Sequence, residues 1–153
     1  MVRAPVDPAY VARVAEAPKG PFGSPGFHLW HASLRWTQEV ARALQPVGLT
    51  HTQFFLLGAV GWLTKSRGEA PKQREVADFA KLDKMTTSQV TRALESHGLL
   101  AREDDPADSR AWRLTLTAKG KKRLTEAVAR VREVDARFFG ADAAKLREAL
   151  SKL

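Results

Sequence analysis

Residues 94–120 read LESHGLLAREDDPADSRAWRLTLTAKG, and this stretch decides the fold. A short strand is predicted over 99–103, followed by a turn-rich loop of Asp, Pro, Ala and Ser over 104–109. Over 111–116 apolar residues alternate with polar ones, which is typical of a half-buried strand. The stretch therefore predicts a β-hairpin that directly follows the end of a helix.

Two short amphipathic helices are predicted before the hairpin, over 72–82 and 85–97. Gly98 follows the second helix at the position where a glycine commonly ends one. Two short helices joined by a tight turn, with a hairpin behind them, are the parts of a winged helix-turn-helix, whose second helix enters the major groove of DNA. The residues predicted to face inward are Val76, Phe79 and Ala80 in the first helix and Thr87, Val90 and Leu94 in the second.

The same stretch resembles the signature of the MarR family of winged helix-turn-helix transcriptional regulators. The shared elements are a leucine-rich helix end, the pair GL, a wing of the form D-P-x-D-x-R and a closing LT-x-x-G, and the resemblance covers about 82–120. It implies a mostly α fold with a small β-hairpin wing, and N- and C-terminal dimerisation helices around the winged core. It also implies a sequence-specific, ligand-responsive repressor that binds a pseudo-palindromic operator as a homodimer.

The flanking sequence fits this plan, with a Pro/Gly-rich arm at 1–26 and a single MarR-like domain at 27–153. The winged core is expected at about 50–117, and the dimerisation helices at about 27–46 and 118–153. Both terminal segments offer more apolar surface than one small domain can cover, which favours a homodimer. The helix boundaries rest on a capping box of Thr50 and Gln53, caps at Thr117 and Asp142, and a break at Gly140. The last helix carries Leu146, Ala149, Leu150 and Leu153.

Composition limits the remaining possibilities. The chain has 153 residues, of which 44% are hydrophobic, so one core is expected. It has no cysteine, which excludes disulfides and thiol-based redox sensing. The first 26 residues lack the apolar run of a signal peptide, and the apolar run 54–63 is too short to cross a bilayer, so a cytoplasmic protein is expected.

Charge supports a polyanionic partner only weakly. The net charge is +8, yet segment 72–118 holds eight Lys and Arg against eight Asp and Glu. DNA binding must therefore be argued from the positions of individual charges. This neutral sum is also the best argument for the alternative function, a winged-helix protein-interaction module without DNA binding.

The predicted recognition face carries groups that read base edges, because Gln pairs with adenine and Arg with guanine. Arg110 occupies the position of the wing-tip arginine that in MarR relatives reaches toward the minor groove, and Asp108 is placed to orient its guanidinium. Lys84 and Lys72 are expected to contact phosphates. The predicted DNA-binding residues are Lys84, Thr86, Ser88, Gln89, Arg92, Asp108, Arg110 and Arg113.

A ligand site is predicted from the resemblance, since MarR relatives commonly bind a small aromatic or other anionic molecule between the dimer helices and the DNA-reading part. His28, His31 and His51 lack a carboxylate at metal-ligand spacing, so ordinary helix histidines are expected and no metal is predicted. Phosphate-binding loops, nucleophile elbows and HExxH are absent, so neither an enzyme nor a cofactor is predicted. The residues expected to line the ligand pocket are Trp30, His31, Arg35, His51 and Trp62.

Overall fold

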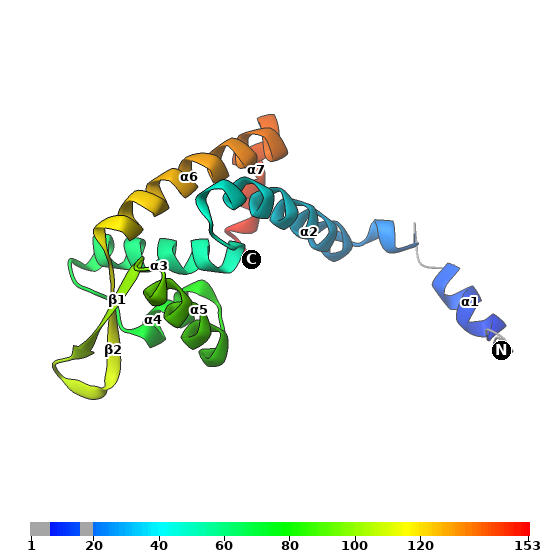
Figure 1. The fold of residues 1–153 in the computed structure, drawn as a ribbon. Coiled ribbons are helices and arrows are strands. Elements are labelled where there is room, and N and C mark those ends of the chain that lie inside the picture. Colours follow the sequence, from blue (N-terminus) through cyan, green and yellow to red (C-terminus); the bar gives the residue numbers. More distant parts are fainter. Residues whose placement is uncertain (1–6, 16–19) are drawn as a thin grey trace, which may run out of the picture. The chain divides into compact units, whose positions relative to one another are not determined.

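The computed structural model describes residues 7–15 and 20–153. The chain divides into two compact units, Met1–Gln38 and Glu39–Leu153. In the first unit, His28 uses Nε2 in a 2.7 Å hydrogen bond to the carbonyl of Phe22, which ties the start of α2 to the segment before it. Figure 1 shows the elements of this unit, namely α1 (Pro8–Ala15), the 3-10 helix η1 (Gly20–Gly23) and α2 (Pro25–Leu44), which continues into the second unit.

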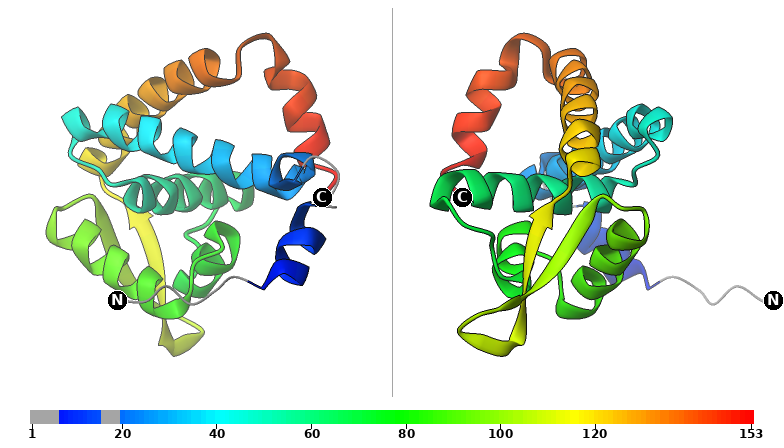
Figure 2. Two further views of the ribbon diagram at one scale, coloured as in Figure 1. Left: turned by 90° about the vertical axis from the view of Figure 1, so that its right-hand side faces the viewer. Right: turned by 60° about the vertical axis from the view of Figure 1, so that its left-hand side comes forward.

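The second unit is built around α3, which contacts α4, α5 and β2 as well as α6. In Figures 1 and 2, α3 lies between α6 on one side and the short helices and hairpin on the other. This arrangement matches the mostly helical, winged fold that the sequence predicts. Its elements are η2 (Gln45–Val47), α3 (His51–Arg67), α4 (Gln73–Ala80), α5 (Lys84–Ser96), β1 (Leu100–Asp105), β2 (Asp108–Leu116), α6 (Ala118–Phe139), η3 (Gly140–Asp142) and α7 (Ala143–Leu150).

Helix α3 begins at the predicted capping box. The Gln53 amide donates to the Thr50 hydroxyl at 3.2 Å, and the Thr50 amide donates to the Gln53 side chain at 2.9 Å. These two bonds satisfy amides that the helix itself leaves without partners. The centre of α3 is buried, which makes it the core helix of the unit; its buried residues are Phe54, Leu56, Leu57, Ala59, Val60 and Leu63.

Helices α4 and α5 form the predicted helix-turn-helix. Lys81 adopts the left-handed conformation that ends α4, and the Asp83 carboxylate then caps α5 by accepting the Thr86 amide at 2.8 Å. Thr87 and Leu94 face inward as predicted, whereas the prediction for Phe79 is wrong because its side chain is 50% exposed. Val76 and Ala77 set the inner face of α4, and Phe79 lies beyond its edge.

The hairpin is longer and its turn tighter than predicted, because both strands extend into the expected loop at 104–109. Acidic side chains close the turn: Asp105 accepts the Ala107 amide at 2.9 Å, and Asp108 accepts the Arg110 amide at 3.0 Å. The strands pair antiparallel from Leu100 opposite Leu116, and the register shifts at Asp104/Asp105. Both turn-closing acids therefore stabilise a wing that projects from the helices.

Helix α6 starts in close contact with the hairpin base. Thr117 caps it by accepting the Gly120 amide at 2.9 Å, as predicted. A Cβ on Gly120 would lie 2.0 Å from the carbonyl oxygen of Leu99, so only glycine fits this junction. Further along, Ala127, Val131 and Val134 are buried in the single chain.

The C-terminal helix differs from α6 in burying nothing within one chain. Asp142 makes no side-chain capping bond, contrary to the prediction, because η3 carries the backbone continuously from α6 into α7. Leu146, Leu150 and Leu153 are exposed, as are Leu29, Trp30 and Leu34 of α2. Within the described ranges, no helix combines the length and the apolar character that crossing a bilayer requires.

Candidate nucleic-acid interface

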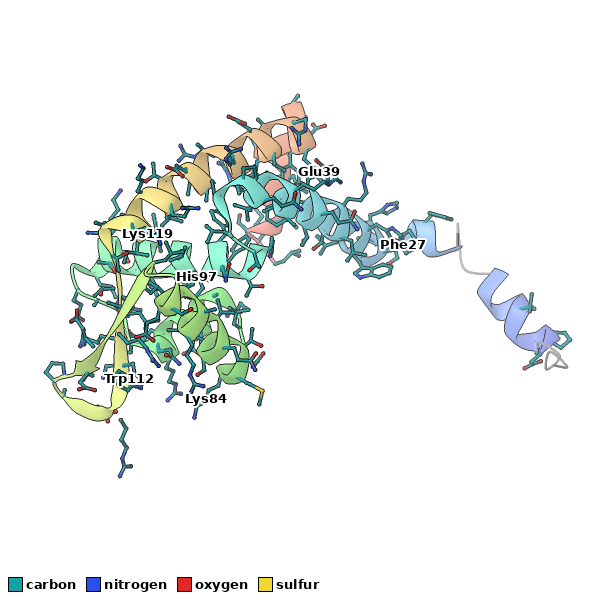
Figure 3. All side chains as sticks on the ribbon, viewed as in Figure 1. Phe27, Glu39, Lys84, His97, Trp112 and Lys119 are labelled. Carbon is teal, nitrogen blue, oxygen red and sulfur yellow. The ribbon has the colours of Figure 1, made fainter. Side chains whose placement is uncertain are left out.

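A groove of about 800 Å³ runs between the recognition helix α5, helix α4 and the wing. Lys84, Ser88 and Arg92 enter it from α5, while Asp108 and Arg110 enter from β2. Figure 3 shows Lys84 and Trp112, two residues that line it, in the lower part of the second unit, below His97 and Lys119. The groove thus brings together five of the eight residues predicted to bind DNA.

The lining of this groove is strongly cationic. Two carboxylates, Asp78 and Asp108, also line it, so positive charge exceeds negative charge. Concentrated positive charge along a groove is the electrostatic pattern that binds a phosphate backbone. The cations that line it are Lys72, Arg74, Lys84, Arg92, Arg102 and Arg110.

The neutral charge sum of segment 72–118 is explained by what its acids do. Glu75 accepts the Lys72 amide at 2.7 Å, and Glu95 pairs with Arg102 at 2.6 Å. Asp83, Asp105 and Asp108 accept backbone amides in the helix cap and the wing turn. Five of the eight acids therefore hold the scaffold, and the cations dominate the groove.

Electrostatics agree with these structural roles. Burial acts to raise the pKa of Glu75, but the Lys72 amide and the nearby Arg67 charge outweigh burial and lower it. Hydrogen bonds from Thr86 lower the pKa of Asp83. Both carboxylates therefore stay ionised at neutral pH while they cap α4 and α5.

Three predicted DNA-binding residues do not line the groove. Gln89 is exposed elsewhere on α5, and the Thr86 hydroxyl donates to Asp83 at 2.6 Å. Arg113 is only 21% exposed, and its guanidinium donates to three acceptors within the protein. Their direct roles in DNA binding stay predictions.

The wing tip also differs in detail from the expected arrangement. Asp108 is bonded to the backbone amide of Arg110, and no ion pair joins their side chains among the described residues. The Arg110 side chain is exposed on the wing, and Asp108 stabilises the turn instead of orienting the Arg110 guanidinium.

Arg74, Arg102 and Trp112 were missed as groove residues. Arg102 pairs with Glu95 of α5 and lies 5.1 Å from the centre of the Trp112 ring, so it links the wing to the recognition helix. Strand alternation could have found part of this arrangement, because it places Arg110, Trp112 and Leu114 on one hairpin face and Arg113 on the other. Arg74 gives no comparable signal, since exposed arginines on helices are common.

The predicted ligand pocket draws on both units and stays a prediction. Trp30, His31 and Arg35 belong to the first unit, whereas His51 and Trp62 belong to the second. Burial lowers the pKa of His51, which favours a neutral ring. No group of three or more potential metal ligands occurs among residues 7–15 and 20–153.

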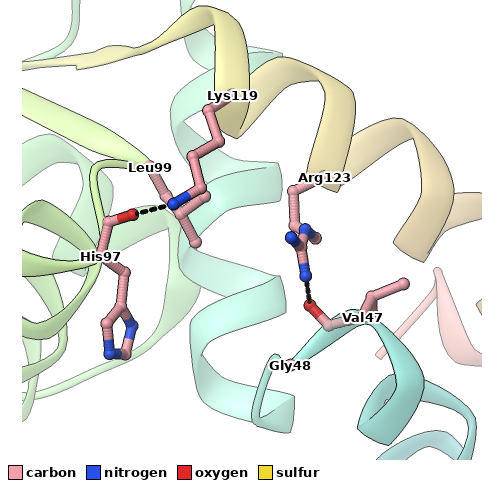
Figure 4. A pocket seen from close by; sticks show the side chains of 6 residues that line it. All are labelled: Val47, Gly48, His97, Leu99, Lys119 and Arg123. Atoms are coloured by element: carbon pink, nitrogen blue, oxygen red, sulfur yellow. Dashed lines mark hydrogen bonds between the residues drawn. The ribbon is translucent and has the colours of Figure 1, made fainter.

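A smaller cavity of about 230 Å³ lies between the end of α5, η2 and the start of α6 (Figure 4). Lys119 donates to the carbonyl of His97 at 2.8 Å, and Arg123 donates to the carbonyl of Val47. Two cations of α6 thus bind carbonyls at the ends of α5 and η2, and at the end of α5 the helix dipole also favours positive charge. Lys119 thus joins the end of α5 to α6, and Arg123 joins η2 to α6.

Comparison with known proteins gives consistent matches. Residues 49–112 match the MarR family. The chain is 39% identical over 122 residues to the uncharacterised HTH-type transcriptional regulator YdcH of Bacillus subtilis, covering 80% of this chain and 82% of YdcH. The solved structure of the Mycobacterium tuberculosis regulator MOSR in complex with DNA is 27% identical, with a TM-score of 0.69 and coverage of 84% and 92%. CouR from Rhodococcus jostii RHA1, bound to p-coumaroyl-CoA, is 26% identical, with a TM-score of 0.75 and coverage of 87% and 93%.

Proposed function

Because this chain belongs to the MarR family of DNA-binding transcriptional regulators, we propose that it is a repressor that reads a pseudo-palindromic operator as a homodimer. The observation that carries the proposal is the groove between α5 and the wing, lined by six cations and two carboxylates. A DNA strand seated there would place phosphates beside Lys72 and Lys84 while α5 enters the major groove.

The proposed homodimer is supported by apolar surface that one chain leaves exposed. Helix α7 buries no residue, and Trp30 and Trp62 are 59% and 58% exposed. Exposed apolar side chains on several helices are typical of surfaces that a second copy covers. Two-fold symmetry would present two α5 helices about one turn of DNA apart, ~10 base pairs centre to centre.

A small effector is the second part of the proposal. CouR was solved with p-coumaroyl-CoA, and BpsR of Bordetella bronchiseptica is described as regulated in DNA binding by 6-hydroxynicotinic acid. The predicted pocket of Trp30, His31, Arg35, His51 and Trp62 combines aromatic and basic side chains, which suits an aromatic acid. Such a ligand releases DNA only if it favours an arrangement of the two reading parts that the operator does not match.

The experiment is selection of duplexes from a random pool by the full chain, followed by affinity measurements at several salt concentrations. We expect an enriched pseudo-palindrome. We also expect an affinity that falls as the salt concentration rises, because binding releases counterions from the phosphates and added salt opposes that release. Recovery of no enriched duplex, together with no salt-dependent binding, would support the protein-interaction module instead.

A further inference from the structure

A buried ion network centred on Asp105 lies near the turn end of the wing, where the hairpin meets the connector between α3 and α4. Its side chain is 0% exposed and accepts Arg113 Nε at 2.6 Å, while Lys72 Nζ lies 3.5 Å away. Arg113 also donates through one NH group to Glu69 and to the carbonyl of Ala70, both at 2.8 Å. One guanidinium therefore joins the wing to the connector between α3 and α4.

Backbone contacts reinforce this junction. The Leu114 amide donates to the carbonyl of Pro71 at 2.9 Å, and Lys72 and Arg113 form an isolated antiparallel bridge. The connector thus pairs with the outer edge of β2 over a short stretch of backbone. Because Lys72 immediately precedes α4, the network fixes the wing relative to the first turn of that helix.

Asp105 and Arg113, at the centre of the network, do not face the groove, whereas Lys72 belongs to both. Arg110 lines the groove with Lys72 and Arg74, but neither Arg113 nor Asp105 lines it. Arg110, Ala111 and Trp112 all line the groove, and Arg113 is the next residue of β2 and does not. A planar guanidinium that donates to three acceptors at once also holds those acceptors in a fixed arrangement, and here the acceptors belong to the wing and to the segment before α4.

We propose that Arg113 is a positioning residue, which sets the spacing between the wing arginine Arg110 and the cations of α4 and α5 and so decides whether Arg110 reaches DNA. This inference rests on the proposed function. It gives Arg113 an indirect role in place of the direct DNA contact expected from the sequence. The contribution of Arg110 to binding should then depend on Arg113, Asp105 and Glu69, none of which lines the groove.

The test measures the effect of Arg110→Ala in several backgrounds, on a duplex selected by the wild-type chain and made with A·T-rich or G·C-rich flanks. The backgrounds are wild type, Arg113→Met, Arg113→Lys and Glu69→Gln. Glu69 is 64% exposed, so Glu69→Gln weakens the junction by removing one carboxylate charge, without burying an unpaired charge. Asp104→Asn is the control, because it removes one carboxylate from an exposed wing position outside the network.

In wild type and Asp104→Asn, Arg110→Ala should lower affinity on the order of tenfold on the A·T-flanked duplex, and less on the other. In Arg113→Met and Glu69→Gln, the loss of affinity caused by Arg110→Ala should shrink to about threefold or less and no longer depend on the flanks. The reason is that Arg110 is then no longer held where it reaches the DNA, so removing its side chain costs less. Arg113→Lys keeps a charge beside Asp105 and should restore part of the effect. Exchange of the Leu114 amide, measured without DNA, should quicken in Arg113→Met.

Equal losses from Arg110→Ala in all backgrounds, with wings that stay folded by amide exchange, would overturn the positioning role. A wing that unfolds in Arg113→Met leaves the milder Glu69→Gln background to decide the matter. If no duplex is enriched by the wild-type chain, the proposed function itself fails, and that result is distinct from equal losses across backgrounds.

Discussion

Arg113 donates its Nε to Asp105 at 2.6 Å, and this carboxylate is closed off from solvent. Burial acts to raise the pKa of Asp105, but hydrogen bonds from Arg113 and Ala107 and the charges of Arg113 and Lys72 outweigh burial and lower it. The ionised form is therefore the one that the folded wing favours.

Stability should accordingly fall as the pH drops from about 4, the ordinary pKa of Asp, through the lower pKa of folded Asp105. Stability falls with the pH because Asp105 in the unfolded chain has the higher pKa and so is protonated before Asp105 in the folded chain. Thermal unfolding of Asp105→Asn should depend less on pH in this window than that of Asp104→Asn. Equal pH dependence in the two variants would show that the Asp105 carboxylate contributes nothing there.

Gly120→Ala should destabilise the fold by about 2–3 kcal/mol or more, as for an overpacked site whose backbone must move. The added Cβ would meet the Leu99 carbonyl oxygen at 2.0 Å, which no side-chain rotation relieves. Gly58→Ala is the matched control, since its Cβ meets nothing within 4 Å and Ala favours a helix by ~1 kcal/mol. Urea denaturation of both variants checks the contrast.

Local sequence patterns predict the helices of this fold but not the contacts between distant segments. Periodicity and the predicted caps at Thr50 and Thr117 place the helices well, because these caps act through bonds to residues three positions away. The role of Arg113 depends on Glu69, 44 residues distant, and local patterns carry no such information. The exposure of Phe79 likewise depends on how α4 is rotated against α3, which its own sequence leaves open.

The chain should sediment as a dimer at micromolar concentration. Removing residues 141–153, or changing both Leu146 and Leu150 to Glu, should shift it toward monomer, because these exposed leucines lose the partner that covers them. Arg147→Ala on the same helix should leave the mass unchanged. A well-folded wild-type monomer at that concentration would contradict the homodimer.

Base reading and phosphate binding should separate between two side chains of α5. Gln89→Ala should relax sequence preference at a cost of about 1–3 kcal/mol, as for a lost base contact. Lys84→Ala should weaken selected and scrambled duplexes alike and lower the salt slope by about one. Lys122→Ala, an exposed cation of α6 outside the groove, is the control and should change neither. Indistinguishable effects of Gln89→Ala and Lys84→Ala on the two duplexes would argue against base reading by Gln89.

Effector binding should depend on the aromatic and basic residues of the predicted pocket. An aromatic carboxylic acid that raises the melting temperature should also release the selected duplex, because it binds one arrangement of the dimer better than the other. Trp30→Ala and Arg35→Ala should weaken that compound in calorimetry, while Trp112→Ala in the wing should not. If a compound binds Trp30→Ala and Arg35→Ala as tightly as the wild type, the effector binds at another site.

The outer face of α5 carries a consequence for divergence between regulators. Met85 is 72% exposed, and the side chains of Met85 and Gln89 make none of the caps, turns and ion pairs described above for the second unit. Mutations at these two positions can therefore accumulate with little effect on folding, because surface changes away from structural contacts are usually near neutral. Gene duplication followed by drift at residues 85 and 89 would yield paralogues with new operators on an unchanged scaffold.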